Sequence, residues 1–334
     1  MDKEASLVIP TLNEGENLSM TIESIRETIT GAYEIIVVDN GSTDGSTDCI
    51  EQMEDSRIRL LRTGERLGVA GARNYGAAFA ESDILIFIDA HMLFPRNWLA
   101  PVLDVLHEEQ VRVVVPAVSA WGNPYAIGYG ISWKGEKLEP RWLGKQSPHP
   151  YPVPLAGGCF QAFHRAFFYE IGGYDPGMTN FGSEDLEMCL RVWLLGYQVK
   201  IVPQVEISHR FRRSAPYEFG WIDTSYNFLR LVYAHFNEQR IERVLAAHVT
   251  TPSFDEALKR VKVSDIWLRK RTLELKRTYD DDWFFRTFDI KEYEEAGKPV
   301  TSGQDSVSRL DSAGLDAGSG QVESSRQVQD LPLL

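Results

Sequence analysis

Residues 34–44 read Glu-Ile-Ile-Val-Val-Asp-Asn-Gly-Ser-Thr-Asp, a short run of mostly β-branched residues that ends in a polar cluster. Such a run predicts a buried strand over residues 34–38 followed by a loop. Residues 6–9 repeat the pattern and lead into a polar segment at residues 10–14. Apolar runs at 58–61 and 84–88 complete the strands expected in the first half of the chain.

Amphipathic stretches separate these strands. Leu18, Ile22 and Ile25 recur at helical spacing, and a second such stretch runs from Ala70 to Phe79. Strands that alternate with helices predict an α/β fold. We therefore expect a Rossmann-like, mostly parallel sheet flanked by helices.

The rest of the chain changes character twice. Residues 113–158 are rich in Gly, Pro and aromatic residues, which predicts strands joined by long loops. Helical periodicity returns over 184–195, a further strand is expected at 198–202, and 221–279 reads as a C-terminal helical extension. Beyond residue 296 the chain is mostly Ser, Gly, Gln and Asp, which predicts a disordered tail. The expected divisions are 1–212, 213–295 and 296–334.

The composition of the chain limits the classes of function and the cellular locations that we expect. The 334 residues carry a formal net charge of −13, which disfavours nucleic-acid binding because that binding depends on clustered Lys and Arg. Three widely spaced cysteines predict a reducing compartment. No secretory signal is evident and no apolar run is long enough to span a membrane, so we expect a cytoplasmic protein.

The polar clusters that follow the first two strands are expected to meet. Ligands of open parallel sheets bind outside the carboxyl ends of the strands, so residues 10–14 and 39–44 fall on one edge. The first cluster lacks the Gly-x-Gly-x-x-Gly of dinucleotide-binding dehydrogenases, which disfavours that class. The alternative interpretation of Asn40-Gly41-Ser42 is a tight turn with no ligand.

The strand at 84–88 ends directly in Asp89-Ala90-His91. Side chains two residues apart on extended backbone point the same way, so Asp89 and His91 are able to share one cation. A carboxylate with an imidazole suits Mn²⁺ better than Mg²⁺. The alternative is a capping Asp beside an unrelated His.

The order of these motifs resembles that of family-two glycosyltransferases with the A-type nucleotide-sugar fold, over roughly residues 5–212. The resemblance implies a nucleotide-sugar-binding catalytic domain at 1–212, a UDP-sugar donor, and a cation (Mn²⁺ or Mg²⁺) held against the diphosphate. It implies that Asp39 contacts the base. The full set implied to bind the nucleotide sugar is Pro10, Thr11, Asn13, Glu14, Asp39, Gly68, Arg73, Asp89, Ala90, Gly157 and Gly158.

The family's Asp-x-Asp motif is Asp-x-His here, which resembles the polypeptide N-acetylgalactosaminyltransferases. In that subgroup a distal His completes the metal shell, and His209 matches it. The metal set implied is therefore Asp89, His91 and His209. The subgroup's membrane anchor, disulfides and lectin module do not appear in this sequence.

Glu184-Asp185 begins the helix predicted over 184–195 and matches the Glu-Asp pair of inverting family members, in which the Asp is the general base. We expect inversion, with Asp185 held ionised by the N–H groups of the helix N-terminus. The alternatives are a helix-capping acid, a retaining enzyme of the polypeptide type, and a catalytically silent scaffold that binds sugar nucleotides.

The acceptor is left open as a peptide, a glycan or a small molecule. The aromatic residues of the variable loops are candidates for stacking on it or for packing in the core: Trp121, Trp133, Trp142 and Tyr151. Arg210, Arg212 and Arg213 are expected to close over the diphosphate. Cys159 is expected to have no catalytic role, and the helical extension is a candidate homodimer surface.

Overall fold

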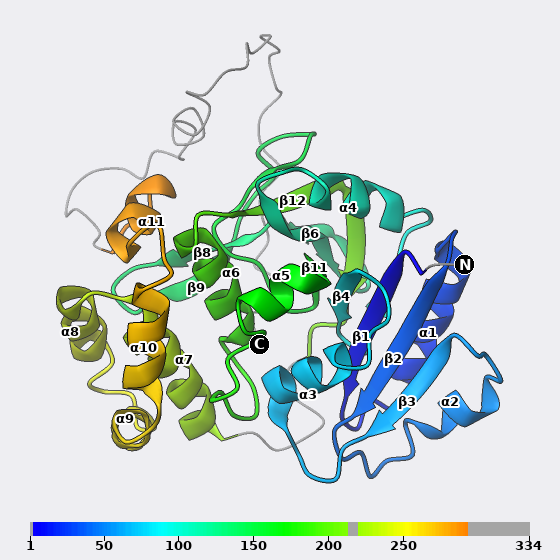
Figure 1. Cartoon of the computed structure of the whole chain (residues 1–334), viewed down its shortest axis with the longest axis horizontal. Helices are drawn as coiled ribbons and strands as arrows, with labels where there is room; N and C mark the ends of the chain where they lie inside the picture. The colour runs from blue at the N-terminus through cyan, green and yellow to red at the C-terminus, as the bar shows by residue number, and fades with distance from the viewer. Residues whose placement is uncertain (1–2, 213–219, 293–334) are drawn as a thin grey trace.

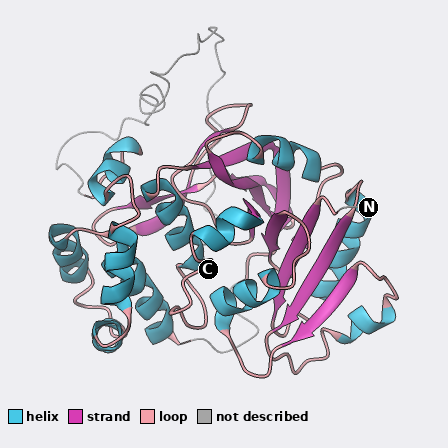
Figure 2. Cartoon of the chain, viewed as in Figure 1, coloured by secondary structure: helices cyan, strands magenta, loops and turns pink. Residues whose placement is uncertain are grey.

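The computed structural model describes residues 3–212 and 220–292. Within them, a ten-stranded sheet runs in the order β10-β12-β6-β11-β4-β1-β2-β3, with β5 beside β12 and β7 beside β6. Helices flank the sheet (Figures 1 and 2). The strands are β1 (Ala5–Thr11), β2 (Tyr33–Asp39), β3 (Ile58–Arg62), β4 (Ile84–Ile88), β5 (Met92–Leu93), β6 (Val111–Ala120), β7 (Asn123–Gly128), β8 (Ile131–Lys134), β9 (Glu139–Trp142), β10 (Tyr151–Pro152), β11 (Phe160–His164) and β12 (Gln198–His209). The helices are α1 (Glu16–Thr28), α2 (Asp48–Gln52), α3 (Gly68–Ala77), α4 (Leu99–Leu106), α5 (Arg165–Glu170), α6 (Glu184–Leu194), α7 (Trp221–His235), α8 (Glu238–Ala247), α9 (Phe254–Lys262), α10 (Ile266–Glu274) and α11 (Asp281–Thr287).

The predicted α/β fold is confirmed. The four expected strands become β1 to β4, and β1 pairs in parallel with both β2 and β4 while β2 pairs in parallel with β3. The sheet as a whole is mixed, because β11 lies antiparallel between β4 and β6. β6 and β12 are again parallel to each other, so β11 reverses direction inside an otherwise parallel run.

Two hydrophobic cores cover the two faces of the sheet. Successive residues of a strand point to opposite faces, and accordingly Leu7 and Ile9 belong to one core while Val8 belongs to the other. The first core includes Leu18, Ile22 and Ile25 of α1 together with α4 residues. The second includes residues of α3, α6 and the C-terminal helices. Because both faces are covered, β1 and β2 are buried almost throughout, which explains their continuous apolar sequence.

The C-terminal helical extension is present from α7 to α11, and Figure 1 shows these helices gathered at the end of the molecule opposite β3. They share the second core with the sheet, through residues such as Leu229, Val232 and Phe236. The proposed division at residue 213 falls in a segment outside the described residues. The tail expected at 296–334 also lies outside them.

A buried ionic cluster joins α6 to these helices. Glu187 is fully buried and accepts hydrogen bonds from Arg191 at 2.8 Å, His235 at 2.9 Å and Arg269 at 3.0 Å. Three donors around one carboxylate offset the cost of removing its charge from water. The cluster therefore fixes α6, whose first residues are Glu184 and Asp185, against α7 and α10.

We expect Glu187→Gln to lower the free energy of unfolding by about 3–5 kcal/mol, because it leaves buried guanidinium charge without its partner. Urea unfolding followed by circular dichroism measures this change. Glu256→Gln is the matched control, since Glu256 pairs with Arg260 at the surface and such i,i+4 pairs contribute only about 0.3–0.5 kcal/mol. Equal decreases in the free energy of unfolding of the two variants would contradict the conclusion that the Glu187 cluster fixes α6 against α7 and α10.

Candidate active site

A cavity of about 380 Å³ opens where β1, β4 and β12 end, so residues far apart in the chain face one space. Most of the predicted site residues line it: Pro10, Thr11, Glu14, Gly68, Arg73, Asp89, Ala90, His91, Gly157, Gly158, Glu184, Asp185 and His209. Two predicted residues, Asn13 and Asp39, are absent from this lining.

Asp39 and Asn13 instead organise the loop after β2. Asp39 Oδ1 accepts the backbone N–H of Ser42 at 2.8 Å, and Asn13 Oδ1 accepts that of Thr43 at 2.8 Å. The chain bends at Asn40 and Gly41, and these two side-chain acceptors hold the loop in place. Asn40, which the sequence analysis did not single out as a ligand, lines the cavity and accepts the N–H of Leu67 at 2.7 Å. Contact of Asp39 with a base stays a prediction.

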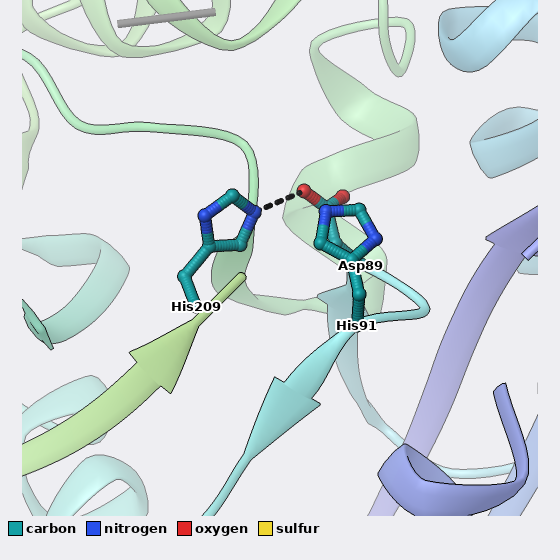
Figure 3. Close-up of side chains that lie close together, drawn as sticks. All are labelled: Asp89, His91 and His209. Atoms are coloured by element: carbon teal, nitrogen blue, oxygen red, sulfur yellow. Dashed lines mark ion pairs between the residues drawn. The ribbon is translucent and has the colours of Figure 1, made fainter. Parts of the chain in front are cut away.

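Asp89, His91 and His209 form a compact cluster. One ligand atom from each lies within 4.8 Å of the other two, and Figure 3 shows the three side chains converging. The pairing of Met92 in β5 with His209 in β12 brings the two imidazole rings together, with their centroids 4.7 Å apart. Asp89 Oδ2 lies 3.5 Å from His209 Nε2.

The chemistry of this cluster fits a cation. Both ring nitrogens of His209 are buried and make no hydrogen bond within the described part of the chain. Burial lowers the pKa of His209, which favours the neutral ring with a free lone pair. Burial alone would raise the pKa of Asp89, but the contacts with His209, Arg73 and His91 hold it well below its usual range. One carboxylate and two imidazoles are a suitable donor set for Mn²⁺ or a similar ion.

Arg73 connects this cluster to the start of α6. Its buried guanidinium lies 3.2 Å from both Asp89 Oδ1 and Glu184 Oε1, and donates to the carbonyl oxygen of Gly158 at 2.7 Å. A Cβ on Gly158 would lie 2.8 Å from Arg73 Nη2, so this close approach requires glycine. The guanidinium thus balances two acidic groups of the pocket, and its contact with a nucleotide stays a prediction.

Asp185 lies at the start of α6, with its carboxylate facing Gly158. Oδ2 accepts the Gly158 N–H at 2.7 Å, and Oδ1 accepts the Leu186 N–H at 2.8 Å. The expectation that these N–H groups hold Asp185 ionised is wrong. Burial and the neighbouring Glu184 carboxylate outweigh them and raise the pKa of Asp185 to about 7.

The loop before α6 is also part of the site. Asn180, Phe181 and Gly182 line the cavity, and the carbonyl oxygen of Asn180 accepts the N–H of Val69 at 2.7 Å. Gly68 has φ +71°, and a Cβ there would lie 2.6 Å from the backbone nitrogen of Asn180. Glycine at position 68 therefore permits the start of α3 to touch the loop before α6, a contact that the sequence analysis did not predict.

The four candidate aromatic residues lie in different surroundings in the structure. Trp142 lines the cavity and packs edge-on against Phe211, with ring centroids 6.0 Å apart. Trp133 and Tyr151 are buried in the core, whereas Trp121 lies beneath the Arg210 guanidinium at 5.8 Å. Stacking of aromatic residues on an acceptor stays open for Trp142 and Trp121.

Two of the three arginines expected over the diphosphate line the cavity, and both also contact residues that follow β1. Their contact with a diphosphate stays a prediction. Arg210 donates to Asn17 at 2.6 Å, and Arg212 forms an ion pair with Glu14. Arg213 lies outside the described residues. Cys159 is buried beside the pocket, and burial raises the pKa of its thiol well above the usual range, which agrees with the expectation of no catalytic role.

Two family models match this chain. The model of "Glycosyl transferase family 2" matches residues 6–172, half of the chain, and that of the "N-terminal domain of galactosyltransferase" matches residues 145–214. The chain is 33% identical over 233 residues to human polypeptide N-acetylgalactosaminyltransferase 14, covering 64% of this chain and 42% of the relative. It is 31% identical over 262 residues to polypeptide N-acetylgalactosaminyltransferase 11 of Xenopus tropicalis, covering 71% of this chain and 43% of the relative. The chain thus spans less than half the length of these two relatives.

Two solved structures share the fold. GalNAc-T7 with UDP, GalNAc and Mn²⁺ superposes with a TM-score of 0.69 at 24% identity, covering 85% of this chain and 56% of the other. The mannosyltransferase PcManGT of Pyrobaculum calidifontis, in complex with GDP-Man and Mn²⁺, superposes with a TM-score of 0.52 at 20% identity, covering 86% of this chain and 84% of the other.

Among the described residues, no helix combines the length and apolarity that crossing a membrane requires. The family match begins at β1, passes through the Asp89 and His91 segment, and reaches α5. This chain therefore belongs to glycosyl transferase family 2.

Proposed function

We propose that the protein is a divalent-cation-dependent glycosyltransferase that moves a hexosyl or N-acetylhexosaminyl group from a UDP-sugar to an acceptor. The observation that carries the proposal is the convergence of Asp89, His91 and His209 in the same cavity as Asp185. The solved relatives contain a nucleotide or nucleotide sugar together with Mn²⁺, which supports the same class of ligand here.

The residues of the cavity have separate roles in the proposed reaction. Asp89, His91 and His209 would hold the cation, which when bound supplies positive charge against the diphosphate of the donor. Arg73 maintains the geometry between Asp89 and the start of α6. Asp185 takes the proton of the acceptor as the acceptor atom bonds to the anomeric carbon and the bond from that carbon to the diphosphate oxygen breaks. A carboxylate with a pKa of about 7 is a better proton acceptor than an ordinary Asp, which supports this role.

Inversion of the anomeric centre follows from a base that acts opposite the leaving group. A retaining reaction is the second candidate, because the curated relatives are polypeptide N-acetylgalactosaminyltransferases, which the sequence also resembles. A catalytically silent binding scaffold is the third, and the presence of Asp89, His91, Asp185 and His209 in one cavity argues against it. The acceptor is a peptide, a glycan or a small molecule.

We expect the protein to release nucleotide from a UDP-sugar in the presence of Mn²⁺ and to stop when a chelator is added. A panel of UDP- and GDP-sugars, with nucleotide release as the readout, tests the donor class. Proton NMR of the first-formed product then separates inversion from retention by its anomeric configuration. Binding of donors without any hydrolysis or transfer, across the panel and with candidate acceptors, would favour the silent scaffold.

We also propose a cytoplasmic location, supported by three cysteines that are all free in the structure. The helices α7–α11 stay a candidate homodimer surface, and nucleic acid is not an expected partner at a net charge of −13. Co-fractionation with a cytosolic marker and a sedimentation measurement test the first two statements.

A further inference from the structure

Glu14 has contacts that a nucleotide ligand would not explain. Its carboxylate is 6% exposed, and Oε2 lies 3.3 Å from Nδ1 of His91. The same carboxylate pairs with Arg212, whose Nη1 donates to Oε1 at 3.1 Å. Glu14 is therefore occupied on both sides by residues of the candidate metal site or its neighbourhood.

The orientation of the His91 ring decides which of its nitrogens lies near Glu14 and which faces Asp89 and His209. Nδ1 of His91 is buried and makes no hydrogen bond among the described residues, and the Glu14 carboxylate lies within ion-pairing distance of it at 3.3 Å. Figure 3 shows one ring nitrogen of His91 on the side of the Asp89 carboxylate and the other directed away from the cluster. Because Nδ1 is the nitrogen near Glu14, Nε2 is the nitrogen that faces Asp89 and His209.

A histidine binds a cation through a ring nitrogen that carries no proton, and the hydrogen bond made by the other nitrogen decides which one that is. A free imidazole in a peptide has no such constraint. A carboxylate beside Nδ1 stabilises the proton there and leaves the lone pair on Nε2.

We propose that Glu14 is a positioning residue that holds the Nδ1 proton of His91, so that Nε2 is presented to the cation. The ion pair with Arg212 fixes the carboxylate in this place, because it anchors Glu14 to the segment that follows His209. Glu14 thereby joins the segment after β1, the start of β5 and the end of β12. This inference rests on the proposed function only in assuming that the cluster binds a divalent cation.

The first test measures Mn²⁺ affinity by electron paramagnetic resonance, without donor or acceptor. We expect Glu14→Ala to weaken Mn²⁺ binding about 10–100-fold, the usual effect of removing an outer partner of a metal-binding histidine. Glu14→Gln retains an acceptor for the Nδ1 proton and should fall between Glu14→Ala and wild type. Glu16→Ala is the matched control, because Glu16 is an exposed acid in the same segment and its loss should leave the affinity unchanged.

The second test reads the tautomer directly in the metal-free protein. Long-range proton–nitrogen NMR distinguishes the two neutral tautomers of each of the seven histidines. At mildly alkaline pH we expect His91 to carry its proton on Nδ1 in wild type and in Glu14→Gln, and to shift toward Nε2 in Glu14→Ala. A wild-type protein with the His91 proton on Nε2 would overturn the inference, whether or not the alanine variant folds.

The outcomes separate this inference from the proposed function. If wild type and Glu14→Ala bind Mn²⁺ equally while Asp89→Ala does not bind it, Glu14 is not a positioning residue but the metal site stands. If wild type binds no Mn²⁺ even with UDP present, the metal site and the role of Glu14 are both wrong.

Discussion

Asp89→Ala and His209→Ala should each lower Mn²⁺-dependent sugar transfer by about 10³-fold or more, because cation stabilisation of the departing diphosphate contributes several kcal/mol. Each variant removes one of three ligand atoms that lie within 4.8 Å of one another. Mn²⁺ binding should be lost in parallel with transfer. Initial rates over a range of Mn²⁺ concentrations, together with Mn²⁺ binding by paramagnetic resonance, measure both effects.

We expect both variants to fold, so that a loss of activity reports the loss of a metal ligand. His209 is held by backbone pairing of β12 with β5 and β6, and its side chain makes no hydrogen bond among the described residues. Asp83→Ala and His149→Ala are matched controls, since both side chains are exposed and neither belongs to the cavity lining. Full activity of His209→Ala with Mn²⁺ would refute the three-ligand site.

Asp185→Asn should leave donor binding nearly intact and reduce transfer by about 10²–10⁴-fold, the usual contribution of a general base. Asn has nearly the same shape as Asp but does not accept a proton at neutral pH. Calorimetry with UDP or a UDP-sugar measures binding, and product formation measures transfer. Loss of donor affinity in this variant would show that Asp185 binds the donor rather than the acceptor proton.

The pH dependence gives an independent check on the same residue. Asp185 must be ionised to accept a proton, and its pKa is raised to about 7 by burial and by the Glu184 carboxylate. The transfer rate should therefore rise with pH and reach half of its plateau value at a pH of about 7, instead of near pH 4 as for an ordinary carboxylate. The residual activity of Asp185→Asn should lack this rise. A wild-type profile that is flat from pH 5 to 8 would contradict the role.

Asn at position 185 also loses one acceptor, because the carboxylate of Asp185 accepts N–H groups with both oxygens. The amide nitrogen of Asn would face either the Gly158 or the Leu186 N–H. Thermal unfolding of the variant is therefore measured beside its kinetics, and a small loss of stability is compatible with the prediction as long as donor affinity is retained.

The sequence by itself determined the α/β class, the first four strands and the identity of the candidate metal residues. These features depend on the local sequence. Residues 84–88 form an apolar run that predicts a strand without reference to distant residues, and Asp89 and His91 follow it two residues apart. The choice of His209 came from its place in a resembling motif. The pairing of β5 with β12 then supplied the contact that the resemblance implied.

Only the tertiary structure decided the properties that depend on neighbours distant in the chain. The reversal of β11, the burial of Trp133, the contact of Glu14 with His91 and the raised pKa of Asp185 all arise from packing between separate segments. A helix N-terminus alone predicts an ionised Asp185, because its N–H groups are local and visible in the sequence. Two effects oppose these N–H groups: the burial of Asp185 and the charge of Glu184. Both take effect only when α6 packs against the sheet, because an electrostatic energy depends on what replaces water around a group.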